Sequence, residues 1–260
     1  MPLVSLLADI GESYGPYVMG QDDLLLEVIS DANVACGFHA GDPMVMDRTV
    51  ASSLAADVSV GGHPGFPDVL GFGRRAMDLS YDQVRTDVLY QLGALGAFLG
   101  AHGLSMAHVN VHGKLDNMAG TDPVYAAAVV DALLAYDPGL VLVAQDGELE
   151  RRALRAGLSV AYAFMADRGY EDDGQPVDRS RPGALLHDSA QIVDRALQVL
   201  ETGTVPSVNG VAVPMRCDAV LVHGDTAEAV DNARLLRAGI EAAGVTVAAI
   251  PRVVAARVVA

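Results

Sequence analysis

The sequence predicts an α/β fold, an irregular (β/α) barrel of seven or eight mostly parallel strands. Short apolar runs rich in β-branched residues recur along the 260 residues. They are continuous rather than alternating, as expected for parallel strands buried on both faces. Helical patterns lie between them, and this alternation is typical of a barrel or a doubly wound sheet. We favour the barrel because no Gly-x-Gly-x-x-Gly turn of a dinucleotide-binding sheet follows a strand.

The expected strands are the apolar runs, taken in chain order. They span residues 3–8, 33–36, 58–61, 107–111, 140–144, 159–164, 219–222 and 246–249.

Capping residues mark three of the helices between these strands. The spacing of Ser80 and Gln83 matches a capping box and predicts a helix over 80–103. Pro123 holds a favoured first-turn position for a second helix. A third helix is expected over 225–243.

Three connections, 61–79, 165–188 and 204–218, are too long to be simple links between elements. Residues 208–211 read Val-Asn-Gly-Val, which predicts a hairpin with a type I′ turn. The sequence shows no linker, repeat or low-complexity run. We therefore expect residues 1–260 to form a single domain.

Composition excludes several classes of partner. The formal net charge of −16 argues against nucleic acid and anionic membrane surfaces. Two cysteines make no disulfide framework, the N-terminal residues lack the basic region of a signal peptide, and no apolar run reaches the length of a membrane span. We expect a cytoplasmic protein and leave open whether it forms homo-oligomers.

Titratable side chains follow several of the apolar runs, most of them beside a glycine. They are Asp9, Glu12, His39, His63, His112 and His223. Active sites of β/α barrels lie at the rim formed by the carboxyl ends of the strands. We expect the first five to line one pocket there and to take part in catalysis as acid–base groups or ligands.

The same side-chain types occur in divalent metal sites. Asp9, His39 and His63 are the candidate ligands, and Glu12 or His112 would be further ones. These residues lie on separate strands and so lack the local spacing that makes a zinc motif specific. The alternative is that the histidines are hydrogen-bonded groups that orient a substrate.

Other reactive side chains carry less information. Cys36 precedes His39, which allows a Cys–His nucleophile pair, but a buried strand cysteine is the commoner case. We expect His102, His108 and His187 on helix or strand faces or in loops rather than at a glycine turn that ends a strand, and we assign them no role.

Several arginines stand out in so acidic a chain. They are Arg74, Arg75, Arg168 and Arg179. On loops above the rim, guanidinium groups can hold a carboxylate or phosphate with two hydrogen bonds. The alternative is that they form salt bridges, with Asp68, Asp78 or Asp167 as partners.

Long motifs identify a resemblance over about residues 5–245. They are Asp-Ile-Gly-Glu-Ser-Tyr-Gly (9–15), Asn-Val-Ala-Cys-Gly-Phe-His-Ala-Gly-Asp (33–42), Gly-His-Pro-Gly-Phe-Pro-Asp (62–68), Gly-Phe-Gly-Arg-Arg (71–75), Ala-Asp-Arg (166–168), Arg-Ser-Arg-Pro-Gly-Ala (179–184) and Val-His-Gly-Asp (222–225). The chain closely resembles the LamB/YcsF family, whose bacterial members are known as the A subunit of an ATP-dependent 5-oxoprolinase.

The resemblance implies a β/α barrel related to glycoside hydrolase and sugar-deacetylase barrels. It also implies hydrolysis of the lactam of 5-oxo-L-proline to L-glutamate, with ATP as co-substrate of a complex with 5-oxoprolinase subunits B and C. Two alternatives remain open. One is a stand-alone enzyme that acts on another lactam, amide or small acid, and the other is a non-catalytic substrate-binding or regulatory partner of a hydrolase.

The chain departs from the family pattern in two strands. Leu7 stands where the family has asparagine; Asn110, Lys114 and Asp116 stand where it has lysine, alanine and tyrosine. We expect these departures to fall in the pocket and to leave the substrate open. The residues expected to bind substrate are Asn33, Arg74, Arg75, Asn110, Lys114, Arg168 and His223.

Overall fold

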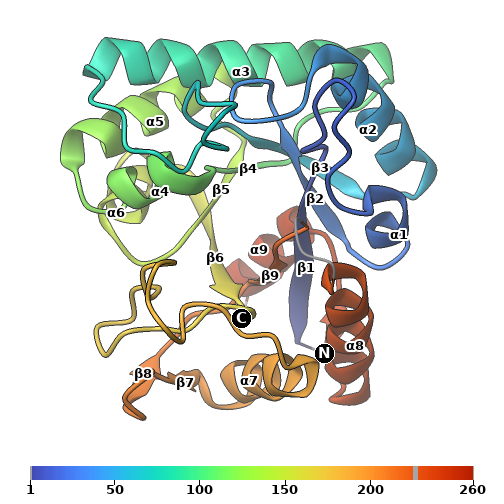
Figure 1. The fold of residues 1–260 in the computed structure, drawn as a ribbon, viewed down its shortest axis with the longest axis vertical. Coiled ribbons are helices and arrows are strands. Elements are labelled where there is room, and N and C mark those ends of the chain that lie inside the picture. Colours follow the sequence, from blue (N-terminus) through green and yellow to red (C-terminus); the bar gives the residue numbers. More distant parts are fainter. Residues whose placement is uncertain (1, 225–227, 260) are drawn as a thin grey trace.

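The computed structural model describes residues 2–224 and 228–259, and its centre is a closed barrel of parallel strands surrounded by helices (Figure 1). The barrel strands are β1 (Leu3–Ile10), β2 (Asp31–Ala35), β3 (Ser59–His63), β4 (His108–Asn110), β5 (Val141–Ala144), β6 (Ser159–Met165) and β9 (Ala219–Val222). They pair in that order, and β9 pairs back with β1. An eighth strand, β10 (Thr246–Val247), pairs with the start of β1. The predicted barrel of seven or eight strands is confirmed.

The helices lie between and around these strands. They are α1 (Asp22–Leu26), α2 (Pro43–Ala55), α3 (Tyr81–Ala101), α4 (Gly113–Ala119), α5 (Pro123–Tyr136), α6 (Glu148–Arg155), α7 (Ser189–Thr202), α8 (Ala229–Ala242) and α9 (Ile250–Val259). The predicted capping box of Ser80 is present at the start of α3, and Pro123 is the first residue of α5. The expected start of the third helix at residue 225 lies outside the described residues.

Strands from both ends of the chain meet in the barrel, because β1 pairs with β9 and β10. That residues 1–260 form one domain stays a prediction. Along the described residues no single helix is long and apolar enough to cross a membrane; only α4 and α5 taken together, bent by 112°, reach that length and composition.

The strands β7 (Thr204–Pro206) and β8 (Ala212–Pro214) form a hairpin where the sequence predicts one. The prediction of a type I′ turn between them is wrong. That turn needs a positive φ at both central residues, and Gly210 has one while Asn209 does not. The loop is longer instead. The Ser207 hydroxyl accepts the backbone N–H groups of Asn209 and Val211, which stabilises the wider turn.

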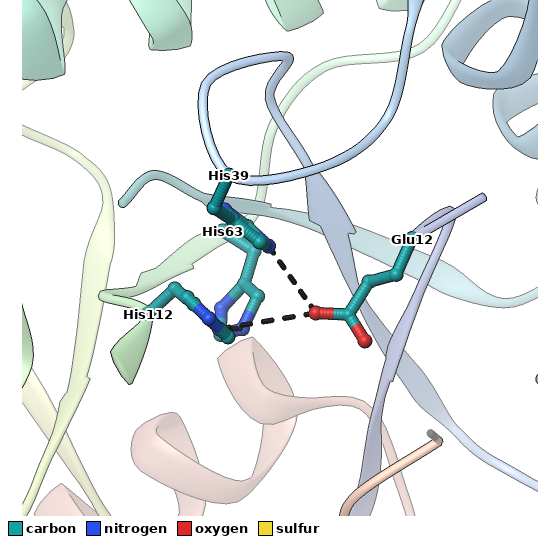
Figure 2. A group of neighbouring side chains, drawn as sticks. All are labelled: Glu12, His39, His63 and His112. Carbon is teal, nitrogen blue, oxygen red and sulfur yellow. Dashed lines mark hydrogen bonds and ion pairs between the residues drawn. The ribbon is translucent and has the colours of Figure 1, made fainter. Parts of the chain in front are cut away.

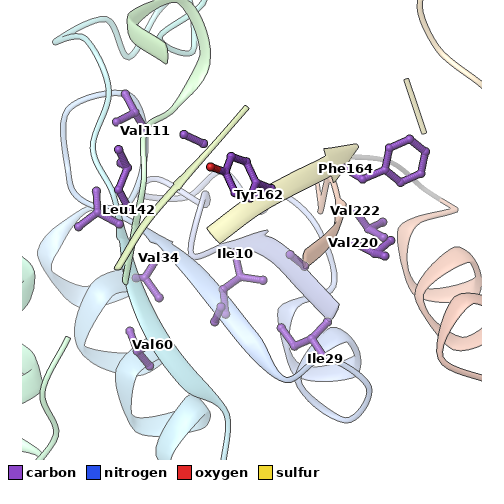
Figure 3. Packing of buried hydrophobic residues seen from close by; sticks show 14 of the residues in the cluster. Ile10, Ile29, Val34, Val60, Val111, Leu142, Tyr162, Phe164, Val220 and Val222 are labelled. Carbon is purple, nitrogen blue, oxygen red and sulfur yellow. The ribbon is translucent and has the colours of Figure 1, made fainter. Parts of the chain in front are cut away.

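Most of the apolar core lies between the strands and the helices, and Figure 3 shows part of it, including Ile10, Val34 and Leu142. Side chains alternate along each strand, so every second residue faces the barrel interior. There β5, β6 and β9 contribute an apolar cluster with Leu7. Strands β2 to β4 contribute buried polar side chains instead. The barrel interior therefore has an apolar half and a polar half.

Candidate active site

A cavity of about 670 Å³ lies at the carboxyl ends of the barrel strands, a size typical of small-molecule sites. Strand ends and the residues after them supply Asp9, His63, Asn110, His112 and His223. The loops and α4 supply Arg74, Lys114, Asp116, Arg168, Gln175, Asp178 and Arg179. The loop after β6, on which the sequence predicts Arg168 and Arg179 above the rim, thus forms one wall.

The alternation of side chains along a strand explains why these residues of β1 and β4 face the barrel interior. Residues spaced by two point to the same side of a strand. On β4 and the residues just after it this rule places His108, Asn110 and His112 on the inner side, and on β1 it places Leu7 and Asp9 there. Leu7 packs in the apolar inner cluster and does not line the cavity. The expectation that this departure lies in the pocket is therefore wrong, whereas Asn110 does line it.

Four buried side chains converge beside the cavity: Glu12, His39, His63 and His112 (Figure 2). One ligand atom of each lies within 4.8 Å of the others. Glu12 Oε1 is 3.2 Å from His39 Nε2 and 3.8 Å from His112 Nδ1. His112 Nδ1 is 2.9 Å from His63 Nε2. We call these four residues the histidine cluster. The expectation that all five rim residues line the pocket is wrong for Glu12 and His39, which are buried behind its wall, whereas Asp9, His63 and His112 line it.

Two nitrogen lone pairs face each other in this cluster. His63 Nδ1 lies 2.6 Å from the carbonyl oxygen of Asn110, and His112 Nε2 lies 2.8 Å from that of Phe72. A carbonyl only accepts, so each of these nitrogens donates its proton. In the neutral rings the other nitrogens, which are 2.9 Å apart, then carry lone pairs. Such a pair is unfavourable unless a proton or a metal cation lies between them.

Burial keeps two of these rings neutral. Burial, with the charges of His63 and Arg74, holds the pKa of His39 well below its usual range. Burial, with the charges of His39 and His63, does the same to the pKa of His112. The two rings stack with centroids 3.8 Å apart. Gly73 packs against them, and a side chain at residue 73 would place its Cβ 2.8 Å from His112 Cδ2. Neutral imidazole is the form that binds metal.

Asp9 lies beside the histidine cluster but outside it. Its Oδ1 is 3.5 Å from His63 Nε2 and accepts a hydrogen bond of 2.8 Å from Asn33 Nδ2. Of the three candidate metal ligands predicted from sequence, His39 and His63 therefore belong to the cluster, and Glu12 and His112 complete it in place of Asp9.

Asn33 does not face the cavity, contrary to the expectation that it binds substrate. It is fully buried, and its amide donates to Asp9 Oδ1 and to Asn110 Oδ1, the latter at 2.9 Å. The expectation is wrong because residue 33 lies in the middle of β2, which begins at Asp31, two residues earlier than predicted.

The arginines divide between the cavity and its supports. Arg74 lines the cavity with its guanidinium 4.8 Å from the centre of the Phe72 ring. Arg168 also lines it, but it donates to the carbonyl groups of Val177 and Ala184 and so anchors the loop after β6. Arg75 is absent from the cavity lining.

Arg75 pairs with Asp68 instead, through both its Nε and its terminal nitrogen. The alternative interpretation of a salt bridge thus describes Arg75 better than the expected role in substrate binding. The hydrogen bond from Arg75, together with its charge, holds the pKa of Asp68 below its usual range.

His223 lies at the end of β9 and forms a charged pair on the cavity wall. Its Nδ1 is 2.7 Å from Asp167 Oδ2. Burial alone would lower the pKa of His223, but the carboxylate of Asp167 outweighs burial and raises it. With Arg74 and Lys114, a protonated His223 gives the cavity cationic groups suited to an anionic substrate.

Arg74→Ala should weaken binding of a carboxylate substrate, and Arg75→Ala should not. A lost charge-assisted hydrogen bond costs about 1.5–3 kcal/mol, or roughly 10- to 150-fold in KM. Arg75 is the matched control because its side chain is 66% exposed and bonded to Asp68. Steady-state kinetics of both variants test this, and equal KM values for the two would contradict it.

Asp116, which replaces a family tyrosine, is a carboxyl group on the cavity wall. Burial, with the nearby charge of Asp9, raises the pKa of Asp116 to about 7. The folded state therefore favours the protonated form, and the charged form destabilises the fold increasingly as the pH rises from about 4 to 7.

Asp116→Asn should therefore raise the melting temperature more at pH 8 than at pH 5, because it removes a charge that only the higher pH develops in the folded protein. Thermal denaturation at the two pH values measures this. Asp82→Asn, at an exposed position in the first turn of α3, is the control. An equal gain for Asp116→Asn at both pH values would contradict the raised pKa.

Cys36 is a core residue rather than a nucleophile. It is buried among apolar side chains, and its thiol donates to the carbonyl of Val34. Burial raises the pKa of Cys36 to about 12, so it stays protonated near neutral pH.

Comparisons with known proteins match nearly the whole chain. The LamB/YcsF family model matches residues 4–255. A 5-oxoprolinase A subunit of Ralstonia nicotianae is 45% identical over 242 residues, which cover 93% of this chain and 93% of that relative. The 5-oxoprolinase A subunit of Gluconobacter oxydans is 44% identical over 248 residues, 95% of this chain and 98% of that relative. The crystal structure of a lactam utilization protein from Thermus thermophilus has a TM-score of 0.91 at 43% identity and covers 96% of this chain and 100% of that one.

Proposed function

Because the chain belongs to the LamB/YcsF family, we propose that it is the A subunit of an ATP-dependent 5-oxoprolinase, which hydrolyses the lactam of 5-oxo-L-proline to L-glutamate. Relatives at 44–45% identity that are named as 5-oxoprolinase A subunits support this proposal. The observation that carries it is one cavity lined both by His63 and His112 of the histidine cluster and by cationic side chains. Lactam hydrolysis needs an activated water, and the substrate carries a carboxylate.

The histidine cluster is proposed to hold a divalent metal cation. The donor set of three imidazoles and one carboxylate suits Zn²⁺ and similar ions. The facing lone pairs of His63 and His112 support a cation between them. When bound, such a cation would polarise a carbonyl or lower the pKa of a water molecule.

Asp9 is proposed to act as the general base. It lines the cavity within 3.5 Å of His63, so a water molecule at the cluster would lie within its reach. Arg74, Lys114 and His223 would hold the substrate carboxylate and turn the lactam bond toward the cluster. In this proposal the lactam bond would lie between the histidine cluster with Asp9 on one side and the three cationic side chains on the other.

ATP and the partner subunits belong to the same proposal. A five-membered lactam resists opening, so coupling to ATP hydrolysis would drive the reaction. No Walker A motif occurs in the sequence, and we propose that 5-oxoprolinase subunits B and C complete the enzyme in the cytoplasm.

The missing strand lysine should make this hydrolysis slower than that of family members which carry it. Asn110 lines the cavity where a cation would stabilise a developing oxyanion. Lys114 also lines the cavity and is the remaining nearby amine. Fast glutamate release that Lys114→Ala leaves unchanged would show that the departure is neutral.

Reconstitution tests the proposal. The chain is combined with the B and C subunits of a relative, 5-oxo-L-proline and ATP, and glutamate is measured with each component omitted in turn. Release that needs every component supports the proposed function. Release by the chain alone without ATP would favour a stand-alone enzyme. Substrate binding without release in any combination would favour a non-catalytic partner.

A further inference from the structure

A row of side chains crosses the polar half of the barrel interior just below the cavity. The strand register aligns Asp9 with Asn33, Asn33 with Gly61, and Gly61 with His108. Asn33 and His108 are fully buried. The sequence alone assigns His108 no role, because it lacks a neighbouring glycine in the chain; its glycine is on the adjacent strand.

Gly61 lets His108 reach across a whole strand. A Cβ at residue 61 would lie 2.2 Å from His108 Nε2 and 2.3 Å from its Cδ2. Any larger residue on β3 would therefore displace the imidazole. Through this gap His108 Nε2 comes within 3.0 Å of Asn33 Oδ1, two strands away.

The contacts of Asn33 allow only one orientation of its amide. Its Nδ2 donates to Asp9 Oδ1 and to Asn110 Oδ1, which both accept. Asn110 is itself fixed, since its own Nδ2 donates to the carbonyl of Val143. Asn33 Oδ1 must then accept, and His108 Nε2–H is the donor that it meets. A flipped amide would set its oxygen 2.8 Å from the Asp9 carboxylate.

The imidazole of His108 is equally restricted. Burial lowers the pKa of His108 to about 3, so the ring is neutral and carries one N–H. That proton lies on Nε2, because a bare Nε2 would face the lone pairs of Asn33 Oδ1. Nδ1 is buried without a hydrogen-bond partner among the described residues. The ring thus gives its single donor to Asn33.

We propose that His108 is a positioning residue for the hydrolytic reaction: through Asn33 it fixes the orientation of the Asp9 carboxylate beside His63. The expected effect on catalysis rests on the proposed function. The fixed orientation of Asn33 and Asp9 rests on the hydrogen bonds alone. This role of His108 explains why a histidine and a glycine occupy neighbouring inner positions below the residues that line the cavity.

Two substitutions of His108 test the proposal. His108→Leu removes the donor, and His108→Gln keeps a side-chain N–H. Supporting residues of this kind typically contribute 10- to 100-fold to activity, so we expect His108→Leu to lower kcat by about that factor with KM changed less than about threefold. His108→Gln should recover most of kcat at a similar melting temperature. Unchanged kcat in His108→Leu, or equal losses in both variants that follow their melting temperatures, would overturn the proposal.

A second measurement is independent of activity. Hydrogen exchange of the Asn33 side-chain amide is followed by NMR with ¹⁵N-labelled asparagine, and Asn33→Ser identifies the signal. Slow exchange in the wild type and His108→Gln, with fast exchange in His108→Leu, supports the positioning role even if the complex does not hydrolyse 5-oxoproline. Equally slow exchange in all three proteins would overturn it.

Discussion

The His112→Ala variant should bind the proposed divalent cation much more weakly than the wild type. His112 supplies one of two facing lone pairs in the histidine cluster, and its ring also stacks on His39. Loss of a group that merely supports a ligand costs 10- to 100-fold in metal affinity, so loss of a ligand should cost roughly 100-fold or more. Titration with Co²⁺, followed by its visible absorption, measures the affinity directly.

His102→Ala is the control for this measurement. His102 lies at the end of α3, where its Nε2 is 2.8 Å from Asp47, and it does not line the cavity. The control should bind Co²⁺ like the wild type. Equal affinity in His112→Ala and the wild type would show that His112 does not bind the cation and would contradict the proposed metal site.

Asp9→Asn should lower kcat by about 10²- to 10⁴-fold, the usual contribution of a general base. The asparagine can still accept the hydrogen bond of Asn33 through its oxygen, so the fold and KM should change little. Rates of glutamate release by the reconstituted complex measure the effect. Asp82→Asn on the exposed side of α3 is the matched control, and a kcat for Asp9→Asn within a few-fold of that control would exclude Asp9 as the base.

The barrel was predictable because its strands are local. Each apolar run is short and rich in β-branched residues, which predicts a strand. Capping residues predict where helices begin, as Ser80 does for α3. The rim position of His63 and His112 follows from the same pattern. His63 is the last residue of β3, and His112 lies two residues after the end of β4. These are properties of a few adjacent residues, which a sequence displays.

Contacts across the barrel were not predictable in the same way. Which histidines meet depends on the register between strands, and no local pattern fixes it. The pairing of Arg75 with Asp68 rather than with a ligand depends on how the loop after β3 folds. Both interpretations of that arginine were consistent with the sequence, and the geometry decided between them.

One missed residue did leave a signal. His108, Asn110 and His112 alternate with valines, a period-two pattern that marks an inner strand face lined with polar groups. Applied to the whole strand, it would have placed His108 below the cavity. Its partner Asn33 would still have required the register of β2 with β3.

We propose above that the histidine cluster is the reaction centre of a lactam-opening enzyme. The most direct test is glutamate release from 5-oxo-L-proline by the reconstituted complex that contains the His63→Ala/His112→Ala double variant, with assembly of the complex verified in the same sample. We expect an assembled complex whose glutamate release does not exceed the background measured without ATP. Release at the wild-type rate would contradict it.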